Sequence, residues 1–207
     1  MVEYRTGKLG RYYGSLFTSS SGLTEAQMQV NAKYISNYFY FKGWTLNAIA
    51  GLLGNLQAES SMNPGRWQSE DVGNNSGGYG LVQWTPATKY FDWCNSLDLS
   101  DPSEMDNNLD RIIYELENNI QWIATSEYNF SFSEFSTSTE SAEYLASAFL
   151  KCYERAGVEV ESTRRSNAIK WYRYISKNKP SSGGSSISFK KKKGFNFVLF
   201  NRRRRLF

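Results

Sequence analysis

The chain has no histidine among its 207 residues, so its proton chemistry must depend mainly on carboxyl groups. Without histidine it cannot form a Ser-His-Asp triad or a Cys-His pair, and it cannot bind a catalytic zinc ion through imidazole. Lysine, tyrosine and cysteine are weaker candidates for proton transfer at moderate pH. Aspartates and glutamates are therefore the first candidates for a reactive group.

Glu59 is distinguished from the other carboxylates by its position at the end of a predicted helix. It follows the apolar run 52–56, and the Met-Asn-Pro sequence at 62–64 ends the helix directly after it. A glutamate half surrounded by apolar side chains has a raised pKa, because burial disfavours its charged form. Such a group can hold a proton near neutral pH and donate it to a leaving sugar oxygen, as the general acid of a glycosidase does. By helix position alone, a solvated residue at a helix end is the simpler interpretation.

A composite motif around Glu59 favours the catalytic interpretation. The segment ESSMNP at 59–64 is followed by GYGLVQWT at 78–85. Together these segments resemble the phage tail lysozyme family and, more distantly, goose-type lysozymes and lytic transglycosylases. The resemblance runs from about residue 24 to residue 175, and it includes further matching residues: Asn31, Gly43-Trp44, Gly54-Asn55 and Tyr153-Glu154-Arg155. By this resemblance, Glu59 corresponds to the catalytic acid of the family.

The resemblance implies a fold, a reaction and a place of action. The fold is a lysozyme-like α+β domain, mainly helical, with a cleft between the Glu59 helix and the glycine-rich loop. The reaction is cleavage of the β-1,4 bond between N-acetylmuramic acid and N-acetylglucosamine in bacterial peptidoglycan, without a metal or cofactor. The protein would belong to the virion, in a phage tail or tail tip, and would open the host cell wall locally while the genome is delivered. Two alternatives stay open: a lytic transglycosylase that leaves anhydro products, and an inactive tail component that only grips glycan.

Asp71 is the candidate for a second carboxylate, because similar members of the family also carry an aspartate there. In that role it would stabilise the oxocarbenium-like transition state or activate a water molecule on the opposite face of the sugar. An aspartate that merely caps its own turn is an almost equally good interpretation. The stereochemistry of the reaction therefore stays open.

Four residues of the glycine-rich loop are candidates for binding the substrate. Gln83 and Thr85 offer hydrogen bonds to N-acetyl groups and sugar hydroxyls, and Tyr79 and Trp84 offer an aromatic platform. Alternatively, Trp84 belongs to the core and Gln83 holds the loop. Glu154, which ends a predicted helix, either reaches the cleft from behind or forms a structural ion pair with the arginine that follows it.

Several predicted helices must position these residues. Thr24 and Gln27 have the spacing of a capping box that begins a first helix, and the second helix covers Leu46–Ser60. Gly51 and Gly54 lie within the second helix, where glycine costs roughly 1 kcal/mol relative to alanine, so we expect close packing against another element. Further helices are predicted at about 104–122, after the Ser/Thr-rich segment 131–139, and at about 163–176, the last with Ile169, Tyr172 and Ile175 inward.

Composition divides the chain into four parts. Residues 1–22 are predicted to be an extended arm, 23–178 the domain, 179–189 a Ser/Gly linker and 190–207 a basic and aromatic tail. The net charge of +4 is uneven, because eight basic residues lie in the tail and the remainder has sixteen basic against twenty acidic residues. Cys94 and Cys152 are expected to be buried thiols, with one disulfide as the alternative.

The tail 190–207 is expected to anchor the protein to other phage tail proteins, by adding a strand to a sheet edge. Contact with DNA is possible, as is binding to an anionic membrane surface without stable insertion, and free disorder is the simplest alternative. The N-terminus lacks the basic-then-apolar order of a signal peptide, so synthesis in the host cytoplasm is expected.

Overall fold

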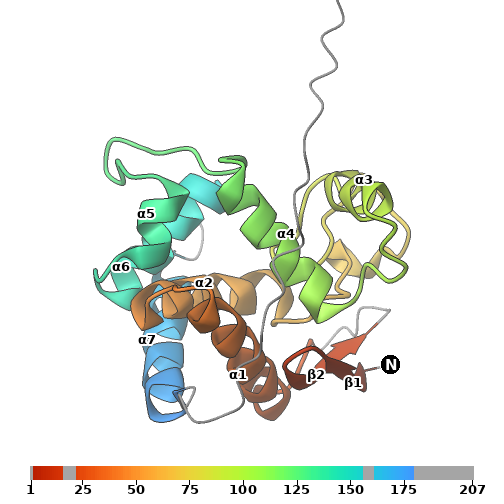
Figure 1. Ribbon diagram of the computed structural model, residues 1–207, viewed down its shortest axis with the longest axis horizontal. Coiled ribbons are helices and arrows are strands. Elements are labelled where there is room, and N and C mark those ends of the chain that lie inside the picture. The colour runs from red at the N-terminus through yellow and green to blue at the C-terminus, as the bar shows by residue number, and fades with distance from the viewer. Residues whose placement is uncertain (1, 16–21, 156–160, 180–207) are drawn as a thin grey trace, which may run out of the picture.

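Helices dominate the computed structural model, which describes residues 2–15, 22–155 and 161–179 (Figure 1). These residues form the α-helices α1 (Glu25–Phe41), α2 (Leu46–Ser60), α3 (Thr88–Ser96), α4 (Met105–Glu117), α5 (Phe132–Thr137), α6 (Ala142–Phe149) and α7 (Glu161–Lys177). Two short helical turns, the 3₁₀ turn η1 (Gln68–Glu70) and the π-helical turn η2 (Leu150–Glu154), and one hairpin, β1 (Val2–Gly7) with β2 (Gly10–Ser15), complete the fold. The mainly helical α+β class is as predicted. The tail 190–207 and all of the linker except Lys179 lie outside the described residues.

The first two helices begin and end where the sequence predicts. Thr24 caps α1: its hydroxyl accepts from the backbone N–H of Gln27 at 3.3 Å, and the Gln27 side chain accepts from the Thr24 N–H at 2.9 Å. Thr45 caps α2 in a similar way, through the N–H of Ala48. Helix α2 ends at Ser60, directly after Glu59, because Ser61 takes up a left-handed conformation with φ 52°.

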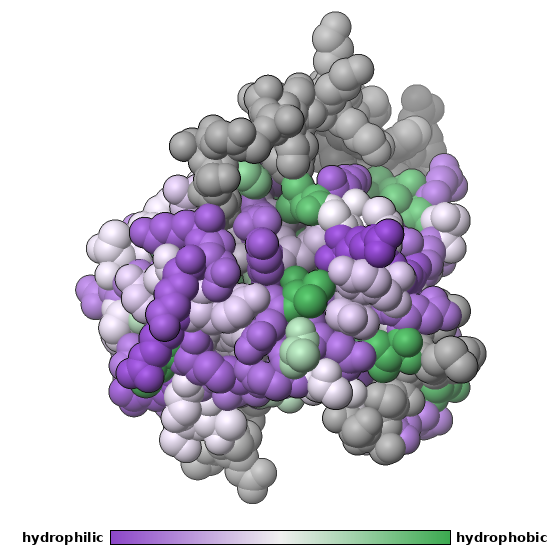
Figure 2. Space-filling model, turned by 90° about the horizontal axis from the view of Figure 1, so that it is seen from below, coloured by the Kyte–Doolittle hydropathy of each residue, from purple (hydrophilic) through white to green (hydrophobic). Residues whose placement is uncertain are grey.

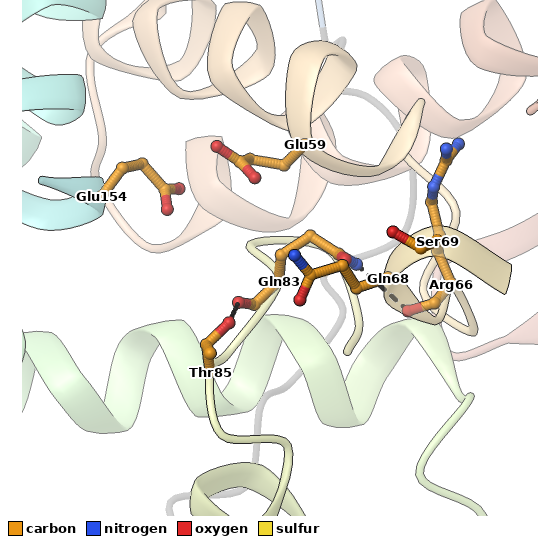
Figure 3. A pocket seen from close by; sticks show the side chains of 7 residues that line it. All are labelled: Glu59, Arg66, Gln68, Ser69, Gln83, Thr85 and Glu154. Atoms are coloured by element: carbon orange, nitrogen blue, oxygen red, sulfur yellow. Dashed lines mark hydrogen bonds between the residues drawn. The ribbon is translucent and has the colours of Figure 1, made fainter. Parts of the chain in front are cut away.

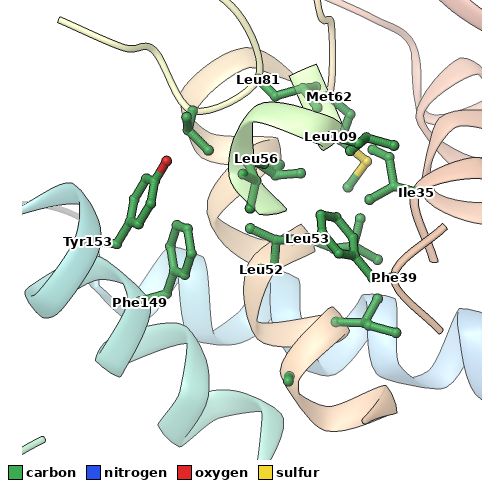
Figure 4. Close-up of a cluster of buried hydrophobic side chains, with 14 of the residues drawn as sticks. Ile35, Phe39, Leu52, Leu53, Leu56, Met62, Leu81, Leu109, Phe149 and Tyr153 are labelled. Atoms are coloured by element: carbon green, nitrogen blue, oxygen red, sulfur yellow. The ribbon is translucent and has the colours of Figure 1, made fainter. Parts of the chain in front are cut away.

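Helix α2 is the centre of the core. Its Leu52, Leu53 and Leu56 are fully buried, and they meet Leu109 of α4 and Phe149 of α6 in the cluster of Figure 4. The helix also packs closely against α7 and α6 on its other sides. The central place of α2 means that its last turn, with Glu59, is held rigidly by the core.

Gly51 and Gly54 allow the close packing that the sequence predicts. A Cβ at Gly51 would lie 2.9 Å from the backbone of Leu145, and a Cβ at Gly54 would lie 2.5 Å from the carbonyl oxygen of Arg164. Neither distance leaves room for a side chain. Glycine at these positions therefore lets α6 and α7 approach the backbone of α2.

The N-terminal segment is not the unpaired arm that the sequence suggested. Its two strands are antiparallel, with Tyr4 opposite Tyr13 and their rings stacked at 4.7 Å. The sequence hid these strands because glycine, arginine and tyrosine alternate irregularly on both faces, so no apolar period of two is visible. Strand formation here depends on contacts with the domain, which composition cannot show.

The hairpin is tied to the helical body by partly buried polar contacts. Tyr12 is fully buried and donates to Glu104 at 2.7 Å, and Arg5 pairs with Glu104 at 2.9 Å. Asn31 of α1 bonds both backbone groups of Tyr13 at 2.6 Å. The buried amide of Asn31 therefore joins the hairpin to the first helix.

The buried face of α7 differs from the predicted one. Tyr172 is 38 % exposed and Ile169 is half-buried, whereas the inner face is formed by Arg164, Ala168, Trp171 and Ile175. These four positions keep a helical spacing, but the first of them is charged. An arginine is usually expected to face solvent, so Arg164 was not counted as a core residue. The apolar residues that were counted indicated the neighbouring face of the helix.

Other features of the described residues agree with the sequence or refine it. Cys94 and Cys152 are buried free thiols, and burial raises the pKa of each. Helix α4 ends at Glu117, earlier than predicted. Within the described ranges, no helix is both long and apolar enough to cross a bilayer. The face seen in Figure 2 is mostly hydrophilic, and its hydrophobic residues lie apart in small groups.

Candidate active site

A polar pocket of about 310 Å³ lies beside the end of α2. Three parts of the chain form it: the last turn of α2, the loop between residues 66 and 85, and the end of η2 (Figure 3). Seven residues line it: Glu59, Arg66, Gln68, Ser69, Gln83, Thr85 and Glu154. The structure thus brings Glu59, Gln83 and Thr85 together, as expected if they share a site.

Glu59 has a cationic partner that the sequence did not reveal. Its Oε1 accepts from Nη2 of Arg164 at 2.7 Å, and the two side chains are 17 % and 6 % exposed. Arg164 also donates to Oδ1 of the buried Asn55 at 3.0 Å. Since Gly54 lets α7 approach α2, it places Arg164 within reach of Glu59. Glu59 is therefore held by a charge-assisted hydrogen bond and is not surrounded by apolar groups alone.

The loop wall of the pocket is held by backbone contacts. Gln83 takes a left-handed conformation with φ 50°, and its Nε2 donates to the carbonyl oxygens of Arg66 at 3.1 Å and Gly80 at 2.9 Å. Gly80 has φ 81°, and a Cβ there would lie 2.6 Å from the Asn108 side chain. The amide nitrogen of Gln83 thus holds the loop, as one interpretation predicted, while the side chain still lines the pocket with Oε1 as its acceptor.

Tyr79 and Trp84 lie beneath the loop and do not line the pocket. They are 4 % and 3 % exposed. Trp84 stacks on Tyr90 with ring centroids 4.5 Å apart and donates from Nε1 to Glu115 at 3.0 Å. The structure therefore uses these rings to support the loop, which is the core interpretation of Trp84, and shows no aromatic platform at these positions.

Asp71 lies outside the pocket. It is exposed, it accepts from Nδ2 of Asn74 at 2.9 Å, and its own N–H bonds the carbonyl oxygen of Gln68 at 3.1 Å. These are the contacts of a residue that caps its own turn. The structure does not bring Asp71 and Glu59 together.

Glu154 is the second carboxyl group of the pocket. It ends η2, and in Figure 3 its carboxyl group points toward that of Glu59. Its Oε1 is fully buried and has no hydrogen-bond partner among the described residues. Burial raises the pKa of Glu154 well above the ordinary value for glutamate, and the negative charge of Glu59 raises it further.

The ion pair that the sequence offered for Glu154 does not form. Nη1 of Arg155 instead donates to the carbonyl oxygens of Gln121 and Cys152. None of the ion pairs formed by the described residues includes Glu154. The motif Tyr153-Glu154-Arg155 is part of the resemblance described above. Because Glu154 lines the pocket, this motif belongs to the candidate site.

Comparison with known proteins agrees with this geometry. The phage tail lysozyme family matches residues 30–175, which include every residue that lines the pocket. The chain belongs to the phage tail lysozyme family. It is also similar to Morphogenesis protein 1 of Bacillus phage B103, with 46 % identity over 159 residues. That similarity covers 77 % of this chain and 43 % of the relative, so the chain matches less than half the length of the relative.

In this phage tail lysozyme domain, Glu115 of α4 connects the two walls of the pocket. Its carboxylate accepts from Arg111 at 2.9 Å, from Trp84 below the loop, and from the hydroxyl of Tyr153. Tyr153 directly precedes Glu154 in η2. The fully bonded carboxylate of Glu115 therefore fixes the loop and η2 relative to each other. No local pattern in the sequence distinguished it from other helical glutamates.

Proposed function

We propose that this phage tail lysozyme cleaves the β-1,4 bond between N-acetylmuramic acid and N-acetylglucosamine in bacterial peptidoglycan, with Glu59 as the proton donor. The observation that carries the proposal is the position of Glu59: it faces an open polar pocket opposite Gln83 and Thr85. Family membership supports a lytic role on peptidoglycan. The reaction as proposed needs no metal or organic cofactor.

Cleavage begins when Glu59 gives its proton to the oxygen that joins the two sugars. The bond between that oxygen and the anomeric carbon then breaks through an oxocarbenium-like transition state. Arg164 keeps the carboxyl group of Glu59 in place, and the negative charge that remains on Glu59 after transfer is stabilised by the same arginine. Oε1 of Gln83 and the hydroxyl of Thr85 lie where they can bond the substrate's polar groups.

The proposal places the enzyme in the virion, acting on the host wall while the genome is delivered. Its partners would be peptidoglycan and, through residues 190–207, a protein of the phage tail. The relative from phage B103 is called a morphogenesis protein, which is consistent with a virion component. Contact of the tail with DNA stays an alternative, and it would appear as binding that weakens steeply with salt.

Mass spectrometry of the products tests the reaction. Purified peptidoglycan is digested with the wild-type chain, with Glu59→Gln, and with Glu117→Gln, which changes an exposed glutamate of α4. We expect muropeptides with a reducing N-acetylmuramic acid end from the wild type and from Glu117→Gln, and none from Glu59→Gln. Intact glycan after wild-type digestion would contradict the proposal and favour a protein that only grips glycan.

A lytic transglycosylase is the second candidate, and one observation favours it. Asp71 does not reach the pocket, and the second carboxyl group there, that of Glu154, has a raised pKa, which disfavours the ionised form that would activate water. In a transglycosylase, a hydroxyl of the substrate itself attacks the anomeric carbon. The same spectra decide, because the products would then have anhydro ends, lighter by one water molecule.

A further inference from the structure

The side of the pocket formed by the last turn of α2 and the end of η2 is its helical wall. Two carboxyl groups and one guanidinium meet there. Glu59 comes from α2 and Glu154 from η2 (Figure 3), and Arg164 of α7 pairs with Glu59. Within the described residues, the arginine donates to Glu59 and to Asn55 and not to Glu154. If both carboxyl groups were ionised, the group of three would carry a net negative charge, and Oε1 of Glu154 would lack a donor among the described residues.

The other charged groups near Glu154 do not relieve this imbalance. Glu115 of α4 adds a further negative charge, although it is bonded to Arg111. Arg155 is positive, but its guanidinium donates hydrogen bonds to backbone carbonyl oxygens. Burial therefore acts together with the charges of Glu59 and Glu115, against Arg164 and Arg155, and the balance raises the pKa of Glu154.

The local backbone holds Glu154 in this position. The chain leaves α6 through the π-helical turn η2, a form that often occurs at functional sites, and Arg155 ends the turn in a left-handed conformation with φ 52°. Tyr153 fixes the turn through its hydrogen bond to Glu115. The strained turn aims a carboxyl group with a buried, unpartnered oxygen at the carboxyl group of Glu59.

We propose that Glu154 keeps the proton of this pair between turnovers and supplies it to Glu59 for the reaction. This inference rests on the proposed role of Glu59. It explains how Glu59 can be ion-paired with Arg164 in the resting enzyme and still act as an acid. Glu154 acts through Glu59, so it is a proton-supplying residue and does not contact the bond that breaks.

The proton balance closes over one cycle. A proton moves from Glu154 to Glu59, and Glu59 gives it to the leaving oxygen while the bond to the anomeric carbon breaks. Attack by water, or by a hydroxyl of the sugar, forms the new bond to that carbon and releases one proton. This proton returns to the carboxyl pair, and Glu154 holds it again. Two groups with different environments thus share one proton, as in other coupled carboxyl pairs.

Nuclear magnetic resonance tests where the proton is held without any activity assay. The side-chain carboxyl carbons of glutamate are labelled with ¹³C in the full chain and titrated. We expect the carboxyl group of Glu154 to titrate well above the ordinary glutamate value of about 4.3, and that of Glu115, whose pKa burial also raises, to titrate above it. The Glu154 signal should be absent in Glu154→Gln, unchanged in Glu117→Gln, and shifted to lower pH in Glu59→Gln, because the like charge is removed while Arg164 stays in place.

The pH profile of cleavage tests the supply of the proton. Glutamine has the shape of a protonated glutamate, so Glu154→Gln should fold normally, which its thermal unfolding temperature checks. Activity of the wild type should fall as pH rises through the raised pKa of the pair. In Glu154→Gln the fall should begin at lower pH, with at least about a tenfold loss near neutral pH and little loss in acid, where the solvent supplies the proton.

Each result separates the two proposals. If the signal that is lost in Glu154→Gln does not titrate above the ordinary range, or if Glu154→Gln has the same pH profile as the wild type and Glu117→Gln, Glu154 does not keep the proton. If the raised titration is present but the wild type cleaves nothing, the carboxyl pair exists and the proposed glycosidase function fails. A purely structural role for Glu154 would lower activity equally at every pH, which also overturns the inference.

Discussion

The two walls of the pocket are built on different principles. The helical wall presents charged side chains that interact with each other: Glu59 pairs with Arg164, and Glu154 faces Glu59 with its buried Oε1 lacking a donor among the described residues. Apart from Arg66, the loop wall presents neutral side chains, and backbone contacts hold Gln83 through the carbonyl oxygens of Arg66 and Gly80. In the proposed reaction, the helical wall therefore controls protons, and the loop wall controls shape and hydrogen bonding.

This difference predicts how the two walls respond to mutation. Changes in the helical wall disturb buried charges. Removing one partner of a buried charged pair is costly, so both the free energy of unfolding and kcat should fall. Changes in the loop wall remove single hydrogen bonds to the substrate, so the affinity for substrate should fall more than kcat. The expected effects below run from the largest to the smallest.

Arg164→Met should have the largest effect on stability. The substitution leaves Glu59 without its cation and Oδ1 of Asn55 without its donor, at a cost of about 3 kcal/mol in the free energy of unfolding. Arg165→Met, on the exposed side of α7, is the matched control and should change little. Urea unfolding measures both. Equal stability of the two variants would show that the helical wall is not held by this pair.

Gly54→Ala tests whether close packing of the helices builds the helical wall. The new methyl group would meet the carbonyl oxygen of Arg164, so we expect a loss of about 2 kcal/mol, although alanine favours helix formation. Ala58→Gly, at an exposed position of the same helix, should cost about 1 kcal/mol through propensity alone. Thermal unfolding compares them. A stabilised Gly54→Ala would mean that α7 can move away from α2 freely.

Much of the frame of the site could be predicted from the sequence, because its signals are local. The capping box at Thr24, the end of the second helix after Glu59 and the small residues Gly51 and Gly54 each depend on neighbours in the chain. These features are confirmed. They place Glu59 in the last turn of a helix but do not show which residues face it.

The remainder depended on contacts between distant residues. Arg164 lies 105 positions from Glu59, and its burial contradicts the usual preference of arginine for solvent. The hairpin formed because Tyr12 and Arg5 meet the body of the domain. An aromatic residue beside a polar loop, such as Trp84, fits both a core position and a substrate-binding position. The hydrogen bond from Trp84 to the buried Glu115 shows that it belongs to the core.

Gln83→Met should affect binding more than turnover. Methionine keeps the length of the side chain but loses the acceptor for substrate and the donor that holds the loop. We expect KM for soluble glycan fragments to rise about tenfold, equivalent to one good hydrogen bond, with a smaller change in kcat. Steady-state kinetics separate the two. A loss confined to kcat would place Gln83 with the proton chemistry of the helical wall.

Asp71→Asn should have the smallest effect. Asparagine can keep the turn contacts of Asp71, and the residue does not line the pocket. Activity should stay within about twofold of the wild type, as usual for surface substitutions away from a site. A loss of a hundredfold in a wall-clearing assay would show that the loop closes over the substrate and brings Asp71 to the bond.

The most direct test of the account is the rate at which Glu59→Gln releases soluble fragments from purified peptidoglycan. Glutamine keeps the size of the side chain and its contact with Arg164 but has no proton to donate. With the unfolding temperature shown to be close to that of the wild type, we predict a loss of at least about 100-fold, while Glu117→Gln keeps full activity. A Glu59→Gln enzyme within a few-fold of the wild type would contradict the central role given to Glu59.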